Sequence, residues 1–511
     1  MTIISATYFL IFLPLLSALF CQIFPHKKFP QSIVFLQFFA IFFLVGAIFY
    51  KVFKVGEISS DFAIFPLSIA LEFNINVVSA SFLAILIFLK VAILFFYKDE
   101  ISKFLNEKNR ALFYSVNCLN IFAIIGILTT NNLLNLFLFL EIYSISFFAI
   151  FSIASDKKIS LLSFNQFFLN AASSLILLFC FIIIYLNFGI FEFSTIKENL
   201  LLKENSSLLK TLALLIFSSF FVRFFPFWLY FQNLKNTNLF AIFFAVHILF
   251  IQANLGFFLI LKFYYLFFSK ISTSLILIFL AIFLSFYSAF RIFISKHLKI
   301  IAINFCLNNF AFILICLAIK SQIAFGAAFF YWLGFNFLGF SLFIFATFLK
   351  RKFNTSLIDR IAVLALSESK IIRALLLPMK VLLIFIAALP FTFLFYANFD
   401  LALSVVQNTN GNSALQFYHF PSFFSPFVIT SIIVSQFAFL VFAFKLMTNL
   451  FYAKSAIKFD FDEIDVKKYA NYLISFWILI ILLAILAFNS EFLHNLAQKF
   501  SLNLMNNLQI Q

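Results

Sequence analysis

The chain has 511 residues, of which 64% are hydrophobic and only 11% are charged, with a mean hydropathy of +1.11. A soluble domain cannot bury that much apolar side-chain surface, so the composition excludes the soluble classes and indicates a polytopic membrane protein. The net charge of +16 comes from basic residues scattered over short loops, which is not the clustered pattern of a nucleic-acid-binding surface.

Apolar segments of membrane-spanning length recur along the whole chain. A transmembrane helix needs about 20 predominantly apolar residues, whereas a transmembrane barrel strand needs about 9–11. The segments here have helical length, so we expect an all-α integral membrane fold with about fourteen transmembrane helices and no separate soluble domain. The expected spans are approximately 3–24, 31–53, 76–97, 111–130, 133–155, 161–187, 211–230, 239–266, 272–293, 298–318, 324–348, 376–398, 424–451 and 469–490.

Two prolines divide the chain into related parts. Pro226 and Pro390 lie late in the seventh and twelfth spans, where each removes a backbone hydrogen bond and breaks the helix. Broken helices at corresponding places in two halves are typical of inverted-repeat transporters, although coincidence is an alternative because proline kinks are common in membrane helices. We therefore expect three N-terminal helices in 1–110, two inverted five-helix repeats in 111–266 and 267–451, and a connector, a last helix and a tail in 452–511.

The distribution of Lys and Arg between alternate loops predicts the orientation. Loops after odd-numbered spans carry 22 of these residues, whereas the opposite side, including both tails, carries eight. Because basic loops stay in the cytoplasm, both termini are expected outside, on the periplasmic face of a cell inner membrane. Segments 351–373 and 454–468 would face the cytoplasm as a surface helix and a docking segment, and a solvated connector is the alternative for each.

Glu141 is the only carboxylate inside any expected span. A carboxylate at the centre of a membrane helix costs about 2.5–3.5 kcal/mol on insertion scales, so one that is present is a functional hypothesis. The alternative is a structural glutamate that forms a hydrogen bond to a neighbouring helix.

Basic and amide side chains add further polar groups within the expected spans. His247 has a reference pKa close to neutrality, but a membrane histidine is more often a hydrogen-bonding partner in helix packing. Amides such as Gln166 and Asn170 could bind water or form hydrogen bonds across helices. Lys90 and Lys262 lie close enough to span ends for their ammonium groups to reach the interface instead. The basic residues within spans are Lys90, Arg223, Lys262, Lys380 and Lys445.

The five cysteines all lie in apolar spans, without a C-x-x-C pair. This pattern predicts neither a disulfide framework nor a metal or iron–sulfur site, so no cofactor is expected.

Several segments resemble one family. TTNNLLNLFLFLEIYSISFFAIFS is similar to the fifth helix of the antiporter-like subunits shared by respiratory complex I, Mrp-type cation/proton antiporters and group 4 hydrogenases. KHLKIIAINFCLNNFAFILICLAI resembles the tenth helix, and FNFLGFSLFIF resembles the N-L-G-A-F passage of the complex I subunit N branch. The resemblance covers roughly residues 60–450.

The resemblance implies a proton pathway in which a fifth-helix Glu pairs with a seventh-helix Lys. Glu141 matches the Glu, but Phe221 stands at the lysine position and Arg223 lies two residues further on, about 200° round an ideal helix. A broken helix could bring Arg223 back toward Glu141. An arginine can bias the carboxylate electrostatically, but it cannot itself exchange protons.

For the later helices the family implies a central Lys or His on the eighth and a Lys or Glu on the twelfth. His247 is a candidate for the central group, with Gln252 near the lysine position of subunit N. No lysine follows Pro390; Lys380 lies ten residues earlier.

The implied function is a proton-translocating membrane subunit, without its own redox centre, of a complex I-like NADH-quinone oxidoreductase. Expected partners are other membrane subunits, protons or Na⁺, and the bilayer. The alternatives are a subunit of an Mrp-type antiporter or a group 4 hydrogenase, and a non-conducting scaffold. The expected roles are Glu141 as gate, Arg223 as its electrostatic partner, His247 as central relay, and Lys380 and Lys445 as the exit row.

Overall fold

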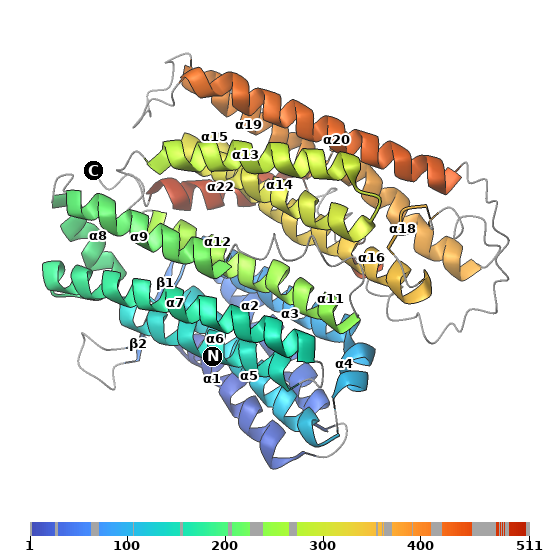
Figure 1. The fold of residues 1–511 in the computed structure, drawn as a ribbon. Helices are drawn as coiled ribbons and strands as arrows, with labels where there is room; N and C mark the ends of the chain where they lie inside the picture. Colours follow the sequence, from blue (N-terminus) through green and yellow to red (C-terminus); the bar gives the residue numbers. More distant parts are fainter. Residues whose placement is uncertain are drawn as a thin grey trace. The chain divides into compact units, whose positions relative to one another are not determined.

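The computed structural model is built from long helices that fall into two compact units, one before and one after residue 272 (Figure 1). It describes residues 3–25, 29–62, 71–105, 107–153, 157–202, 207–224, 239–264, 273–353, 356–359, 361, 370–390, 392–409, 422–451, 477–479, 481, 483, 485 and 490–506.

The first unit is a bundle in which neighbouring helices in the chain mostly pack together: α1 on α2, α5 on α6, α6 on α7 and α7 on α9. In addition α1 packs on α5, and the eighth apolar span packs on α9 and α3. That span is interrupted by a π-helical turn, η2. The helices are α1 (Ile3–Ile23), α2 (Phe29–Val55), α3 (Val77–Phe96), α4 (Lys98–Phe104), α5 (Glu107–Thr129), α6 (Leu133–Ser152), α7 (Lys157–Phe188), α8 (Phe193–Leu202), α9 (Ser207–Phe224), α11 (Leu239–His247), η2 (Ile248–Gln252) and α12 (Ala253–Phe263).

Asparagine caps define where two of these helices begin. The Asn76 side chain accepts a hydrogen bond from the Ser79 amide at the start of α3, and the Ser79 hydroxyl accepts one from the Asn76 amide, completing a capping box. At the start of α6 the Asn132 side chain accepts from the Leu134 amide at 2.9 Å. Because this cap ends the short connection after α5, it sets the depth at which Glu141 lies in α6.

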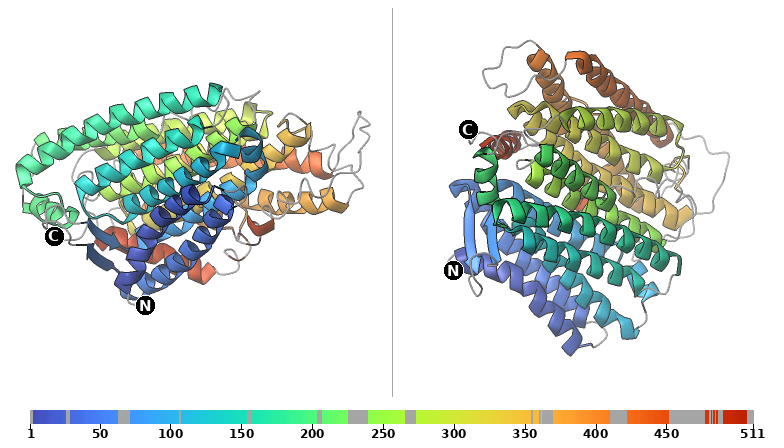
Figure 2. Two further views of the ribbon diagram at one scale, coloured as in Figure 1. Left: turned by 90° about the horizontal axis from the view of Figure 1, so that it is seen from below. Right: turned by 60° about the vertical axis from the view of Figure 1, so that its left-hand side comes forward.

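A small β-hairpin was not expected from the helical pattern. Strand β1 (Ile58–Phe62) pairs antiparallel with β2 (Leu71–Ile75), with Ser60 opposite Phe73. Figure 2 shows the two strands as paired blue arrows. The Asn131 amide donates to the Glu72 carbonyl, and the Phe193 amide donates to the Asn131 carbonyl. The hairpin, the loop before α6 and the loop before α8 are therefore joined by hydrogen bonds. We call this group the hairpin cap; it lies at one end of α5, α6 and α8.

The second unit has α13 packed on α14 and α20, and α15 packed on α14, α19 and α22. Its third long span is interrupted by a second π-helical turn, η4. Phe500 of α22 stacks near Phe329 and Trp332 of α15, which anchors this C-terminal amphipathic helix. The helices are α13 (Thr273–Ile294), α14 (Leu298–Ile319), α15 (Gln322–Leu333), η4 (Gly334–Leu338), α16 (Gly339–Phe353), α18 (Lys370–Ile386), α19 (Phe393–Thr409), the 3₁₀ turn η5 (Ser422–Phe424), α20 (Ser425–Phe451) and α22 (Ser490–Asn506).

The multi-pass helical prediction is confirmed. Eleven described helices are long and apolar enough to cross a membrane, and three shorter apolar helices run over Thr211–Phe224, Leu376–Ile386 and Phe393–Gln407. The count of fourteen is not established, since most of 469–490 lies outside the described residues, as do Pro226 and segment 454–468. Of the expected surface helix 351–373, residues 351–353 end α16 and 370–373 begin α18, while 354–355, 360 and 362–369 lie outside the described residues.

The twelfth expected span is two helices. Helix α18 ends at Ile386 and α19 begins at Phe393, and Ala388 between them has a left-handed φ of +47°. The break lies at Pro390, where the sequence predicted it, because a proline cannot donate the helical hydrogen bond. The expected end at residue 398 was wrong: α19 continues to Thr409, so Asp400 lies within a helix and Glu141 is not the only carboxylate in an apolar helix.

Candidate functional site

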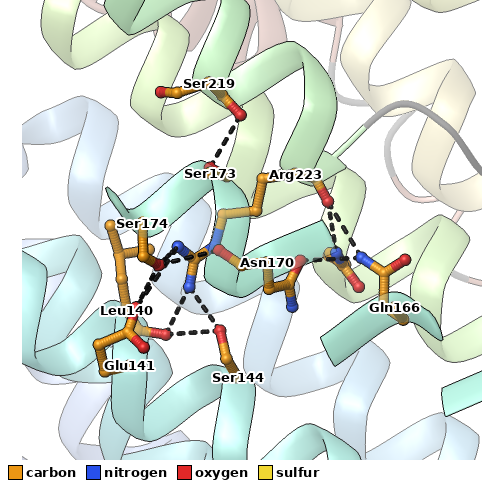
Figure 3. Close-up of polar contacts among 10 residues, drawn as sticks. Leu140, Glu141, Ser144, Gln166, Asn170, Ser173, Ser174, Ser219 and Arg223 are labelled. Atoms are coloured by element: carbon orange, nitrogen blue, oxygen red, sulfur yellow. Dashed lines mark hydrogen bonds and ion pairs between the residues drawn. The ribbon is translucent and has the colours of Figure 1, made fainter. Parts of the chain in front are cut away.

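Glu141 and Arg223 lie together in the first unit, joined by a serine hydroxyl (Figure 3). Arg223 Nη1 is 3.7 Å from Glu141 Oε1 and donates a 2.7 Å hydrogen bond to Ser174 Oγ. The Ser174 hydroxyl in turn donates to Glu141 Oε1. The three side chains come from α6, α7 and α9, so the pairing expected from the sequence is present, through a bridging hydroxyl.

The guanidinium of Arg223 is held from several sides. The Arg223 side chain is 0% exposed, whereas Glu141 is 30% exposed. Nη2 donates to the Leu140 carbonyl at 2.7 Å and to the Ser144 hydroxyl. These bonds to neutral oxygens fix the guanidinium against α6 without using the carboxylate. Glu141 therefore keeps an accessible edge while its inner oxygen faces Ser174 and Arg223.

The end of α9 is fixed by two amide side chains. Carbonyl groups in the last turn of a helix lack partners within it. The Arg223 carbonyl accepts from Gln252 Nε2 at 2.8 Å and from Gln166 Nε2 at 3.2 Å. Gln166 also donates to Asn170 Oδ1 at 2.9 Å. Helix α7 and the π-helical turn η2 thus position the backbone from which the Arg223 side chain extends.

A second buried cluster surrounds His247, the last residue of α11. Lys90 Nζ from α3 lies 3.2 Å from His247 Nε2 and donates to Asn120 Oδ1 of α5 at 2.9 Å. The Asn120 amide donates to Ser146 Oγ of α6 at 2.9 Å. Lys90 is 0% exposed, so the interpretation that its ammonium reaches the interface was wrong: the neighbouring helices cover it completely.

Aromatic rings enclose the imidazole. The ring centroids of Phe147 and Phe151 lie 5.5 and 5.6 Å from that of His247, and Phe243 lies 6.3 Å away. Together with Lys90, these rings leave the histidine 1% exposed. His247 is therefore a buried titratable group and not a surface residue.

Lys262 of α12 reaches the hairpin cap. Its ammonium donates to the Thr130 carbonyl and lies 4.5 Å from the centroid of the Phe193 ring. The carbonyl and the ring face both favour a cation. Lys262 is thus directed to the end of the bundle that carries the hairpin cap.

The two lysines predicted as an exit row belong to the second unit. Lys380 is half-buried in α18, and Lys445 is exposed on α20. In the same unit the Tyr331 hydroxyl donates to Asn398 Oδ1 at 2.6 Å, close in sequence to the half-buried Asp400.

Sequence reasoning missed Ser174, Ser144 and Asn120, as well as the burial of Lys90. A signal for Ser174 was present, because Gln166, Asn170 and Ser174 recur every fourth residue and therefore share one face of α7. No comparable spacing marks Asn120, whose partners come from helices distant in the sequence.

A family model described as "NADH:quinone oxidoreductase/Mrp antiporter, TM" matches residues 130–425, more than half of the chain. No curated protein matches the sequence. Among solved structures, a chain of the membrane-bound sulfane sulfur reductase, an archaeal respiratory membrane complex, aligns with a TM-score of 0.78 at 16% identity, over 98% of this chain and 99% of that one.

Two further solved structures show the same fold. A chain of the Mrp complex from Dietzia sp. DQ12-45-1b aligns with a TM-score of 0.77 at 13% identity, over 99% of this chain and 100% of that one. A chain of respiratory complex I from Thermus thermophilus with bound NADH aligns with a TM-score of 0.70 at 16% identity, over 98% of this chain and 100% of that one. All three neighbours are chains of membrane complexes.

Proposed function

Since the chain belongs to the NADH:quinone oxidoreductase/Mrp antiporter transmembrane family, we propose that it is a proton-translocating membrane subunit of a complex I-like oxidoreductase or a related ion-translocating assembly. The observation that carries the proposal is the Glu141–Ser174–Arg223 contact inside the helical bundle. A carboxylate within an apolar helix persists where its charge is used, and here it has a buried counter-charge and a hydroxyl between them.

Proton uptake by Glu141 would reverse its hydrogen bond to Ser174. The carboxylate accepts from the hydroxyl; once an O–H bond forms on the carboxyl group, that group donates to Ser174 Oγ. The serine hydrogen then turns to the Asn170 carbonyl, which lies 2.9 Å from Ser174 Oγ. Arg223 donates to Ser174 in both states. The serine therefore lets the carboxyl group change charge without leaving an unpaired polar atom.

Arg223 acts as a fixed charge in this scheme. A guanidinium does not release its proton in proteins, so Arg223 favours the carboxylate form of Glu141 but does not carry the proton. Because Arg223 is held by Leu140, Ser144 and Ser174, neutralising Glu141 leaves a buried positive charge in place. That charge would bias the next titratable group of the pathway, for which His247 is the candidate.

The exposed edge of Glu141 supports the proposal that partner subunits adjoin it. With 30% of its side chain accessible, the carboxylate can receive a proton from outside the unit. Its surroundings include the exposed apolar residues Leu138 and Ile145 of the same helix. We assign this face to contact with another membrane subunit. From the distribution of basic loops, we assign the two termini to the outer side of the inner membrane.

The test is Glu141→Gln in the assembled complex, with Glu198→Gln as the matched control on an exposed face of α8. Proton translocation is measured in membrane vesicles, together with the subunit content of the complex. We expect Glu141→Gln to reduce translocation about a hundredfold or more, the lower end of what a positioned acid–base group contributes, and Glu198→Gln to leave it unchanged. Normal translocation in an intact Glu141→Gln complex would identify the glutamate as structural.

A non-conducting scaffold is the second candidate, and one observation favours it. The seventh helix offers Arg223 beside Glu141, where the resemblance implies a lysine that exchanges protons. The same Glu141→Gln measurement separates the two functions, because a scaffold would keep the complex assembled and active in either variant.

A further inference from the structure

Two basic groups face each other in the interior of the first unit. Lys90 Nζ and His247 Nε2 are 3.2 Å apart, and the two side chains are 0% and 1% exposed. They come from helices 157 residues apart in the sequence. A lysine and a histidine both gain positive charge on protonation, so this contact constrains how many protons the two can hold.

The hydrogen-bond geometry allows the pair to hold one proton, whereas two separate bases would hold two. One nitrogen of the contact has to donate and the other has to accept. A charged Lys90 donates to a neutral imidazole, and a charged His247 donates to a neutral amine. With both groups protonated, two donors would face each other at 3.2 Å, and two like charges would be buried together.

The surroundings do not supply a counter-charge for a second proton. Within the described part of the chain, neither nitrogen forms an ion pair with a carboxylate, and Glu141 on the adjoining α6 is paired with Arg223. The packed helices also carry the titratable residues Cys118 on α5 and Tyr143 on α6. Neither is a carboxylate.

The cluster is nevertheless built to hold one positive charge. Asn120 Oδ1 accepts from Lys90 Nζ, and the Asn120 amide is held by Ser146 Oγ, which orients its oxygen toward the lysine. The Phe147 and Phe151 rings lie beside the imidazole. His247 also directly precedes the π-helical turn η2, a type of distortion found frequently at functional sites.

We propose that Lys90 and His247 form a proton-sharing pair that holds a single proton between Nζ and Nε2. In the transfer an N–H bond of Lys90 breaks, its electron pair stays on Nζ, and an N–H bond forms at His247 Nε2. The total charge of the pair remains +1. Its use in transport rests on the proposed function, whereas the sharing of one proton follows from the contact itself.

The charge state of His247 tests the sharing directly. The full chain, labelled with ¹⁵N-histidine and ¹⁵N-lysine, is reconstituted in lipid vesicles and measured by solid-state NMR between pH 5 and 8, with His247→Gln to assign the signal. In the unmodified chain we expect one proton on the pair throughout: a neutral imidazole with Nε2 as the acceptor beside a charged Lys90, in exchange with an imidazolium beside a neutral Lys90 amine. An imidazolium coexisting with a charged Lys90 would overturn the proposal.

Two substitutions extend the test. In Lys90→Met the histidine is the only base left, so we expect its imidazolium to appear as the pH falls within the range; a histidine that stays neutral contradicts sharing. In Asn120→Asp a carboxylate supplies the missing counter-charge, so we expect two protons, with imidazolium and ammonium together. An unchanged neutral His247 in that variant also contradicts the proposal, whether or not Lys90→Met folds.

The transport role has its own measurement. Lys90→Arg keeps the positive charge but cannot release a proton, so we expect proton translocation by the complex to fall at least tenfold while His247 stays neutral. Asn117→Leu, three residues from Asn120 on α5, is the control, because Asn117 donates to the Phe113 carbonyl of its own helix and not to another of the described helices. If Glu141→Gln abolishes translocation and Lys90→Arg does not, the proposed function stands and the transport role of Lys90 fails.

Discussion

The two units share a helical design but differ in how their buried polar groups are bonded. In the first unit charged and amide side chains connect different helices, as in Glu141–Ser174–Arg223 and Lys90–Asn120–Ser146. In the second unit the bonds Tyr331–Asn398 and Ser288–Asn308 connect helices through neutral groups. Three further amides, those of Asn304, Asn309 and Asn336, each donate to the carbonyl four residues earlier in their own helix. Both units contain a π-helical turn and a helix that ends near a proline in the sequence.

This difference separates polar groups that stabilise from those that can respond. An asparagine bonded to its own helix carries no net charge and changes little when a neighbouring helix moves. A charged side chain held by two other helices loses hydrogen bonds with any such movement, because each bond depends on the relative position of two elements. We therefore expect a change in charge within the first unit to alter hydrogen bonds between several helices.

Arg223→Ala should have the largest effect. Removing the arginine leaves the part-exposed Glu141 without its counter-charge and the buried Leu140 carbonyl and Ser144 hydroxyl without their donor, and an unsatisfied buried polar group costs about 1–3 kcal/mol. We expect translocation to fall to background and the midpoint of thermal unfolding in detergent to drop. Arg223→Lys should retain part of the activity, because the charge survives while the guanidinium fork is lost.

The pairing itself is measured by combining Arg223→Ala with Glu141→Gln. Two groups that act as a unit give a double variant little worse than either single one, whereas independent sites give losses that add. Strictly additive losses in translocation would show that the 3.7 Å contact does not couple the two residues in function.

Asn120→Leu should have the next largest effect, on stability. It removes the acceptor for Lys90 Nζ and the donor to Ser146, and an unsatisfied buried polar group costs about 1–3 kcal/mol. The thermal midpoint of Asn120→Leu is compared with that of Asn117→Leu, which has the same change in size on the same helix. Equal losses in the two variants would mean that the bond to Lys90 contributes nothing.

Ser174→Ala tests the role of the bridging hydroxyl. Alanine leaves the Arg223–Glu141 ion pair but removes the group whose hydrogen bond reverses, so we expect a several-fold loss of translocation with little change in stability. Ser173→Ala, whose hydroxyl donates to the Ser219 carbonyl, is the neighbouring control. Wild-type rates in Ser174→Ala would remove the hydroxyl from the pathway.

Asn336→Leu in the second unit should have the smallest effect. Its side-chain amide donates to the Trp332 carbonyl of the same helix, so its loss leaves the backbone ladder intact. We expect unchanged translocation and a shift in the thermal midpoint smaller than that of Asn120→Leu. A loss of translocation as large as that of Ser174→Ala would place proton chemistry in the second unit as well and break the contrast between the units.

The sequence by itself determined the membrane class, most of the helical spans, the break at Pro390 and the position of Glu141 within an apolar helix. These features can be recognised along the chain without the fold. The length of an apolar segment identifies a span, and a carboxylate within such a segment is conspicuous whatever its neighbours in space are. The segments that resemble the antiporter-like family also led to Arg223 as the partner of Glu141.

Only the tertiary structure decided which polar groups meet. The two-residue offset of Arg223 left its direction open at the level of the sequence, and the structure places Ser174 of α7 between Arg223 and Glu141. Lys90 lies near the end of its expected span, yet it is fully buried between Asn120 of α5 and His247 of α11. Hydropathy does not record which helix covers a side chain, because contacts such as Lys90–His247 join residues 157 positions apart.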